Sequence, residues 1–361
     1  MKKLFIPLII IFMSSILNAG VQEEFDFAKK MYDDTLYEEA IGKFQNIIQK
    51  YPTSTLAEEA QFFLGNSYME LEQYVNASFA YKRLLEDHPQ TTLYPQTEFN
   101  LAESLFESKN YFESAQFYQD LIYNYPQSPF ALQSLDKIII ALKNAGMYNE
   151  AILISMDIIE SFTGKAQIPG ILLSLSSVYQ LHNMPDEYEQ TLLKIVDMYP
   201  QSDEKWEAIQ ELSQYYYNNE MPQEALQLLE NGLTETIPRQ YEQSLLLLYA
   251  ELLDRSGDQQ NALEQYKEFY RKFDTYTQRD EIADRIASLE FALTQYKNSA
   301  LTCNEFYKHF PSSSYTPHIQ YLQAGAEFYL KDYTQALTVL DNINFDKTTL
   351  EIQKDIYHLY A

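Results

Sequence analysis

The sequence predicts an all-α solenoid of about nine helix-turn-helix hairpins with a 37-residue period. In most copies a tyrosine is followed three residues later by alanine or serine, and in several a proline follows fifteen residues after the tyrosine. The first marker keeps one spacing without insertion or deletion, at Tyr37, Tyr74, Tyr111, Tyr148, Pro185, Pro222, Gln259, Tyr296 and Tyr333. The prolines of matching phase are Pro52, Pro89, Pro126, Pro200 and Pro311. A fixed period of this length indicates repeats that pack on their neighbours and present long binding surfaces.

The first helix of a repeat is predicted to begin at Thr55. Thr55 and Glu58 have the spacing of a capping box, which satisfies free amides at a helix start. Apolar and small residues then recur at helical spacing up to Leu71. Gly65 lies inside this helix, where glycine costs about 1 kcal/mol relative to alanine. We therefore expect a close helix-helix contact at Gly65.

The second helix is predicted from Tyr74 to Glu86 and is ended by Pro89. Ala77 is the small residue expected to meet the first helix. Both small positions recur at the repeat spacing, which indicates two helices in contact in every unit. The phase of Gly65 holds Ala28, Ala102, Ser176, Ser213, Ala250, Ala287 and Ala324, with Ile139 as the exception. The phase of Ala77 holds Ala40, Ser114, Ala151, Ala225, Ala262, Ser299 and Ala336, with Tyr188 as the exception.

The periodicity also sets the expected domain organisation. One solenoid is predicted over residues 20–348, with units near 21–52, 55–89, 92–126, 129–163, 166–200, 203–237, 240–274, 277–311 and 314–348. Residues 349–361 re-enter the first-helix phase, so we expect a C-terminal capping helix or a truncated next repeat there.

The N-terminus has the pattern of a secretory signal peptide over residues 1–19. Lys2 and Lys3 precede an apolar run from Leu4 to Leu17, and Ala19 offers a cleavage site. The run is shorter than the roughly 20 residues that a transmembrane helix needs. We therefore expect export, with an uncleaved N-terminal anchor as the alternative.

The motif Leu64-Gly65-x-x-Tyr68, followed by Ala77, Tyr81 and Pro89, resembles the tetratricopeptide repeat. The resemblance covers about residues 22–348 in nine copies, although the common form of the repeat has about 34 residues. It implies a right-handed superhelix that binds other proteins. The Tyr-Pro-x-Ser turns between repeats are similar to those of bacterial envelope members of this family, of the β-barrel assembly lipoprotein and Tol-Pal coordinator types.

Composition limits the partners. The net charge of −26 argues against nucleic acid and against an anionic membrane surface as partners, and no direct membrane binding is expected after signal cleavage.

The single cysteine, Cys303, cannot form an internal disulfide. Cys303 falls at a phase that large residues occupy in other copies, so we expect it to be buried and inert.

The sequence shows no motif for chemistry. The nine glycines form no nucleotide-binding loop, and the five histidines have no metal-ligand spacing. We therefore expect no catalytic, cofactor-binding or metal-binding residues, and no cofactor. Acidic pairs such as Glu38 and Glu39 fit solvated helix faces.

The resemblance implies a binding groove on the first helices of the repeats. Carried over by phase, these positions mix acids with amides and aromatic residues. The candidate residues are Glu59, Phe62, Asn66, Met69, Glu70, Phe99, Glu103, Phe106, Glu107, Asp136, Gln214, Tyr217, Glu251 and Asp254. Such a surface suits proteins or extended peptide segments with basic or apolar-aromatic side chains.

Together these observations predict a non-catalytic scaffold or adaptor in the periplasm of a bacterium with an outer membrane. Its expected role is to bind partner proteins during outer-membrane or envelope assembly. A regulator that holds a peptidoglycan enzyme is the alternative. An enzyme whose site has no recognisable motif is a further alternative.

Overall fold

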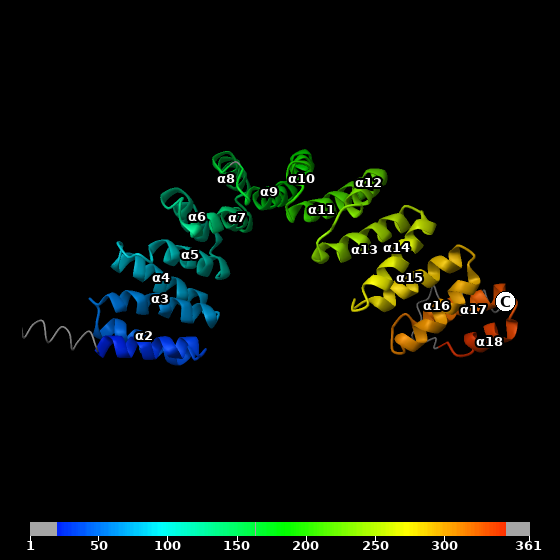
Figure 1. Cartoon of the computed structure of the whole chain (residues 1–361), viewed down its shortest axis with the longest axis horizontal. Helices are drawn as coiled ribbons and strands as arrows, with labels where there is room; N and C mark the ends of the chain where they lie inside the picture. The colour runs from blue at the N-terminus through cyan, green and yellow to red at the C-terminus, as the bar shows by residue number, and fades with distance from the viewer. Residues whose placement is uncertain (1–19, 163, 344–361) are drawn as a thin grey trace, which may run out of the picture. The chain divides into compact units, whose positions relative to one another are not determined.

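The computed structural model describes residues 20–162 and 164–343, and these residues form helices and turns without a β-strand (Figure 1). A first helix covers residues 20–33. The others are α2 (Tyr37–Lys50), α3 (Thr55–Glu70), α4 (Tyr74–Asp87), α5 (Tyr94–Glu107), α6 (Tyr111–Asn124), α7 (Pro129–Asn144), α8 (Tyr148–Ser161), α9 (Ile168–Leu181), α10 (Pro185–Met198), α11 (Glu204–Asn218), α12 (Pro222–Leu233), α13 (Arg239–Arg255), α14 (Gln259–Lys272), α15 (Arg279–Ala292), α16 (Tyr296–His309), α17 (Thr316–Tyr329) and α18 (Tyr333–Leu340). The predicted signal peptide and the predicted C-terminal cap lie outside the described residues.

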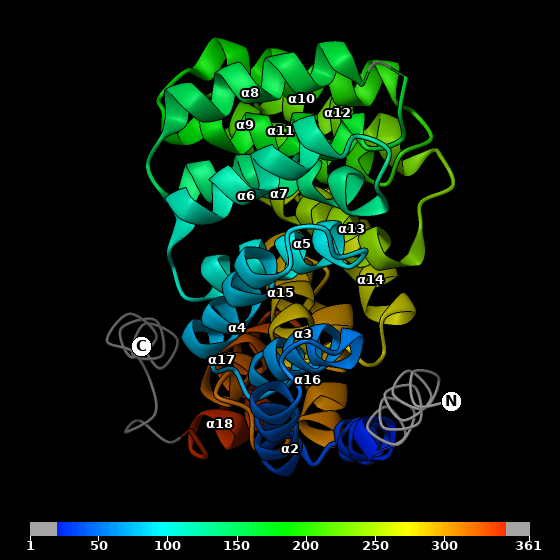
Figure 2. The same ribbon diagram turned by 90° about the vertical axis from the view of Figure 1, so that its left-hand side faces the viewer.

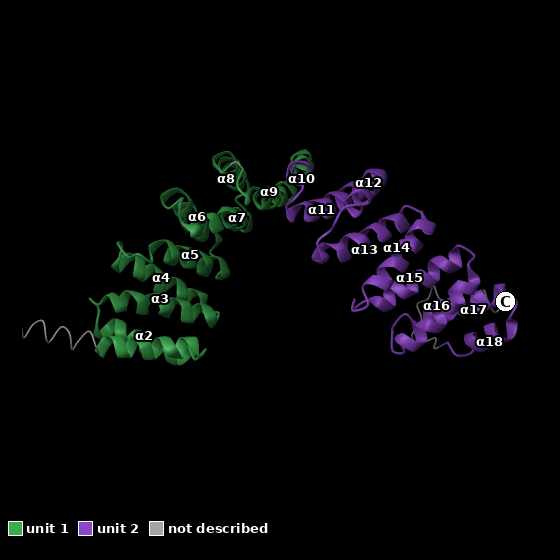
Figure 3. Cartoon of the chain, in the orientation of Figure 1, with its two compact units in different colours: residues 1–191 green, residues 192–361 purple. Residues whose placement is uncertain are grey.

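The chain divides into two compact units, Met1–Thr191 and Leu192–Ala361, and the division falls inside α10 (Figure 3). Within unit 1, consecutive helices such as α2, α3 and α4 lie side by side (Figures 1 and 2). Within unit 2, α13 to α18 follow the same order. This arrangement confirms the predicted all-α repeat fold. No helix in the described part of the chain is both long and apolar enough to cross a membrane.

The helix starts agree with the predicted hairpins, but the prediction of a capping box formed by Thr55 and Glu58 is wrong. The residue that caps α3 is Ser54, whose Oγ accepts a hydrogen bond from the Leu56 amide at 3.2 Å. Glu58 does not reach back to the helix start. It lies 3.4 Å from His88, beside the proline that follows α4. The inter-repeat turn therefore supplies the cap, and Glu58 of α3 contacts the next inter-repeat turn.

The expected close contact at Gly65 is confirmed, and the group that needs the space is an aromatic ring. A Cβ atom at Gly65 would lie 2.6 Å from Cδ1 and 2.7 Å from Cζ of Tyr81 on α4. Ala77, the small residue predicted at the crossing, is fully buried. In the next hairpin the serine at that phase bonds across the pair, because Ser114 Oγ donates to the Ala102 carbonyl at 2.8 Å. The two small positions therefore do bring the helices together.

The turn inside each hairpin has a left-handed residue that the sequence did not indicate. These residues are Thr35, Glu72, Lys109, Gly146, Asn183, Glu220, Gly257, Thr294 and Lys331, all with φ between 57° and 84°. After each one, an amide donates to a carbonyl five residues earlier, as Gln73 does to Tyr68 at 2.8 Å. This is a Schellman motif, which normally uses glycine. Each non-glycine residue here costs about 1 kcal/mol, so the hairpin geometry overrides local preference.

Cys303 is fully buried, as predicted. Burial raises the pKa of its thiol from the ordinary 9.0 to about 12. The thiol therefore stays protonated at neutral pH, which fits the expectation of an inert core residue.

One buried acid interrupts the core of unit 1. Glu98 on α5 is 3% exposed, and its Oε2 has no hydrogen-bond partner in the described chain. The same holds for the adjacent Thr97 Oγ1. Burial raises the pKa of the Glu98 carboxyl from 4.5 to about 7, and the Asp120 carboxylate adds to the rise. One repeat earlier, Gln61 occupies this position as a neutral amide and donates to the Ala80 carbonyl at 2.9 Å.

Replacing Gly65 by alanine is expected to destabilise the protein by about 1–3 kcal/mol, because the new methyl group collides with the Tyr81 ring. The measurement is urea unfolding followed by circular dichroism. The matched control is Gly42→Ala on the exposed side of α2, where a Cβ meets nothing within 4 Å. This control should gain up to about 1 kcal/mol from helix propensity. Equal effects at the two glycines would contradict the tight contact.

Glu98→Gln is expected to stabilise the protein at high pH. Because the folded pKa lies above the unfolded one, the carboxyl destabilises the fold progressively as pH rises from 4.5 through about 7. The gain should approach about 3 kcal/mol at pH 8 and fall below about 1 kcal/mol at pH 5. Thermal and urea unfolding at both pH values test this, with the exposed Glu86→Gln on α4 as control. A gain that does not change with pH would show that Glu98 is not the titrating group.

Candidate functional site

The predicted groove residues all lie on the first helices of hairpins. Glu59, Phe62, Asn66, Met69 and Glu70 are on α3, and the third-repeat set is on α5. The remaining residues fall on α7, α11 and α13. In unit 1 the α5 residues are Phe99, Glu103, Phe106 and Glu107, and the α7 residue is Asp136. In unit 2 the residues are Gln214 and Tyr217 on α11, and Glu251 and Asp254 on α13.

Unit 1 has a hollow of about 640 Å³ between α3 and the start of α5, here called the unit-1 hollow. Glu59 and Asn66 line it, and Phe62, only 6% exposed, belongs to its wall and to the core. Phe62 packs against the ring of Tyr81 with ring centroids 6.1 Å apart. The remaining lining residues are Thr55, Glu58, Phe63, Gln90, Thr91, Thr92, Leu93 and Gln96.

Unit 2 has a hollow of about 440 Å³ between α13 and α15, here called the unit-2 hollow. Two of the predicted residues, Glu251 and Asp254, line it. Its other lining residues are Leu247, Arg255, Tyr266, Tyr276, Gln278, Glu281, Ile282, Asp284, Arg285 and Tyr315. Four carboxylates therefore share this hollow with two guanidinium groups and three tyrosines.

The two hollows occupy equivalent places in the repeat. Five lining positions of the unit-1 hollow recur in the unit-2 hollow 185 residues later, which is five repeats of 37. The pairs are Phe62 and Leu247, Asn66 and Glu251, Thr91 and Tyr276, Leu93 and Gln278, and Gln96 and Glu281. The repeat thus builds the same hollow twice and fills it with different side chains.

Lateral hydrogen bonds hold several groove residues in unit 1. Asn66 Oδ1 accepts from the Tyr81 hydroxyl at 2.6 Å and from the Asn100 amide of the next first helix at 3.2 Å. One repeat later, Glu103 accepts from the Tyr118 hydroxyl and pairs with Lys137 Nζ at 2.8 Å. Burial of Tyr118 raises the pKa of its hydroxyl, and the Glu103 carboxylate adds to the rise, so Tyr118 remains a donor.

These contacts change the expected charge of the groove. Glu103 is neutralised by Lys137, which also lies 5.7 Å from the centre of the Phe99 ring. In unit 2, Asp254 pairs with Arg285. These two acids therefore stabilise contacts between repeats. By contrast, Glu59, Glu70 and Glu107 are exposed, and none of them pairs with a cation among residues 20–162 and 164–343.

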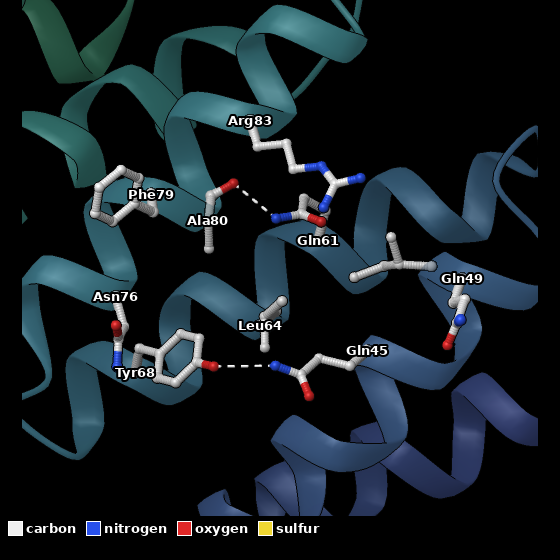
Figure 4. Close-up of a pocket in the computed structure, with 10 residues that line it drawn as sticks. Gln45, Gln49, Gln61, Leu64, Tyr68, Asn76, Phe79, Ala80 and Arg83 are labelled. Atoms are coloured by element: carbon white, nitrogen blue, oxygen red, sulfur yellow. Dashed lines mark hydrogen bonds between the residues drawn. The ribbon is translucent and has the colours of Figure 1, made fainter.

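A third hollow, of about 490 Å³, lies between α2, α3 and α4, and the sequence did not indicate it (Figure 4). Four of its lining residues are amides, and three of these already donate hydrogen bonds, Asn76 to the Gln73 side chain at 3.0 Å. Gln61 donates to the Ala80 carbonyl, and Gln45 donates to the Tyr68 hydroxyl at 3.1 Å (Figure 4). This hollow belongs to the packing between two repeats, and none of the predicted groove residues lines it.

The described residues contain no group of three or more histidine, cysteine, aspartate or glutamate side chains placed to hold a metal ion. The arrangement on the first helices offers carboxylates, amides and aromatic rings to a partner. It is suited to binding side chains of another chain.

Comparison with known proteins identifies the repeat. Residues 59–91 and 96–128 match the tetratricopeptide repeat family. No curated protein matches the chain. Similar solved structures include a tetratricopeptide repeat protein from Parabacteroides merdae, 15% identical, covering 75% of this chain and 98% of its own, with a TM-score of 0.46. YrrB, described as a TPR protein with an unusual peptide-binding site, is 16% identical over 53% of this chain and 93% of its own, with a TM-score of 0.41.

The fold and the surface define an all-α repeat scaffold. Two consecutive units of the chain match the tetratricopeptide repeat family, and the same 37-residue phase continues along the sequence. Tetratricopeptide repeats imply a scaffold for protein-protein interaction.

Glu103→Ala is expected to destabilise the protein by about 1–3 kcal/mol, because it leaves the buried Tyr118 hydroxyl without an acceptor and Lys137 without its partner. Chemical unfolding gives the value. Glu107→Ala, one turn further along α5 and exposed, should stay within about 0.5 kcal/mol of the wild type. If the two variants are equally stable, Glu103 is a surface acid without a structural contact.

Proposed function

We propose that the protein is a non-catalytic scaffold in the periplasm of a bacterium with an outer membrane, where it binds extended segments of partner proteins during envelope assembly. The family supports the interaction role. The compartment rests on the signal-like N-terminus, in which Lys2 and Lys3 precede an apolar run, and on the Tyr-Pro-x-Ser turns.

The observation that carries the proposal is the repeated hollow on the first helices. A side chain of an extended segment fits a hollow of this size, and the groups around it provide both hydrogen bonds and apolar contact. The exposed acids Glu59, Glu70 and Glu107 lie on the same helices as the unit-1 hollow or on the next first helix. We therefore infer partners with basic or apolar-aromatic side chains.

The surface is tested by charge reversal. Glu70→Lys combined with Glu107→Lys is expected to reduce capture of partners from envelope extracts by about tenfold, since both acids attract basic segments. The matched control reverses two exposed acids of second helices, Glu39→Lys with Glu86→Lys, and changes the net charge equally. Circular dichroism confirms that both variants fold. Capture that falls equally in both variants would show that net charge, rather than the first-helix surface, attracts partners.

A fusion to alkaline phosphatase tests the compartment. The full chain fused at its C-terminus to alkaline phosphatase should give an active enzyme in a bacterial host, because the phosphatase folds only after export. An inactive but intact fusion would overturn the periplasmic assignment and leave the interaction role unaffected.

A further inference from the structure

We propose that the unit-2 hollow is a receptor for one positively charged side chain, arginine or lysine, of the bound segment. This inference rests on the proposed function, because it names what the scaffold recognises at one of its two equivalent hollows. It comes from the differences between those hollows.

The five shared positions differ in charge, because none is charged in the unit-1 hollow and two are acidic in the unit-2 hollow. Asn66 and Gln96 are amides in the unit-1 hollow, whereas their equivalents Glu251 and Glu281 are carboxylates. Tyr276 replaces Thr91 and Leu247 replaces Phe62, so the aromatic ring at the shared positions moves from the first helix to the segment before α15. Carboxylates beside aromatic rings bind ammonium and guanidinium groups through ion pairs and cation-π contacts.

The lateral bond that occupies this position in unit 1 is missing in unit 2. Asn66 and Glu103 each bond to the residue 34 positions later, Asn100 and Lys137. The residue 34 positions after Glu251 is Arg285, and its guanidinium is bound to Asp254 instead. Within the described residues Glu251 has no ion pair and no hydrogen bond of its side chain. Its carboxylate is therefore available to a ligand in the unit-2 hollow.

A second acceptor points to the same ligand. The Asp254 side chain is 5% exposed, and its Oδ1 has no hydrogen-bond partner in the described chain. Buried acceptors of this kind are costly unless a donor reaches them. An arginine or lysine side chain supplies several donors and no acceptor, so it matches a site with surplus carboxylate oxygens.

The charges of the hollow favour a cation after its internal pairs are counted. Asp254 is paired with Arg285, and Asp284 is bound to His318 Nδ1 at 2.7 Å, a contact that a neutral imidazole also makes. Glu251 and Glu281 then face a single further cation of the lining, Arg255, whose side chain is exposed. Burial raises the pKa of the Glu251 carboxyl, Arg255 opposes the rise, and Glu281 adds to it. A second cation between the two glutamates would relieve their repulsion.

A peptide array tests the proposal. Each twelve-residue peptide carries one central arginine in neutral flanks and has a twin with citrulline, which keeps the shape of arginine and lacks its charge. The wild-type protein is expected to retain arginine peptides and to bind their citrulline twins about tenfold more weakly or worse. The variant Glu251→Asn with Glu281→Gln, which installs the unit-1 side chains, should lose most of this preference and keep only the part that the exposed acids of α3 and α5 contribute.

The control for net charge is Glu224→Gln with Glu264→Gln, which removes two exposed acids of second helices. It should keep the wild-type preference for arginine. Equal binding of the twins by the wild type, or an equal loss of preference in both double variants, overturns the cation receptor. Neither result bears on the scaffold itself, which is decided by the capture experiment on α3 and α5. Failure of that capture together with a clear arginine preference would overturn the surface assigned in unit 1 alone.

Discussion

Close contact between the two helices of a hairpin is the constraint on which the arrangement of the groove residues in unit 1 depends. Gly65 has no side chain, so the Tyr81 ring lies directly over α3. From there its hydroxyl reaches Asn66, and Asn66 in turn bonds to Asn100 on the next first helix. A packing requirement in the core therefore fixes a polar contact between repeats. Tyr118, Glu103 and Lys137 repeat this chain of contacts one unit later.

The same constraint explains why the groove carries less net negative charge than its residue types alone predict. Acids at the phase of Asn66 are close to a buried tyrosine hydroxyl and to the next repeat, so a neighbouring cation can neutralise them. Sequence phase identifies which helix face they occupy. It does not show whether a lysine or arginine 31 or 34 residues later reaches them, since that depends on side-chain length and on which acids compete for the cation. Arg285, for example, pairs with Asp254 and not with Glu251.

The fold was largely predictable because its signal is steric and repeats in register. Gly65, Ala77 and the inter-repeat prolines mark the helix crossing and the helix ends, and the structure places α3 and α4 accordingly. The capping residue was wrong by one position, since Ser54 and Thr55 both suit a cap and only backbone geometry separates them. The left-handed turns could not be predicted, because residues such as Lys109 and Thr294 adopt that conformation only when the packing of the two helices fixes the backbone of the turn.

The candidate site was predictable only in part, for a related reason. Phase places residues such as Phe62 and Glu251 on the first helices, and both do line hollows. The hollows also need the segments before α5 and α15, where Thr91 and Tyr276 lie. Thr91 keeps the hydroxyl of the recurring Tyr-Pro-x-Ser turn, whereas Tyr276 departs from it, so the turn pattern does not predict the wall of the unit-2 hollow. Residues that keep the period are held by packing and cannot vary without loss of stability. Selectivity therefore has to reside where the repeat tolerates exchange, as it does between Asn66 and Glu251 and between Gln96 and Glu281. An exchange of amide for carboxylate at such positions changes the ligand while leaving the hairpin beneath it intact.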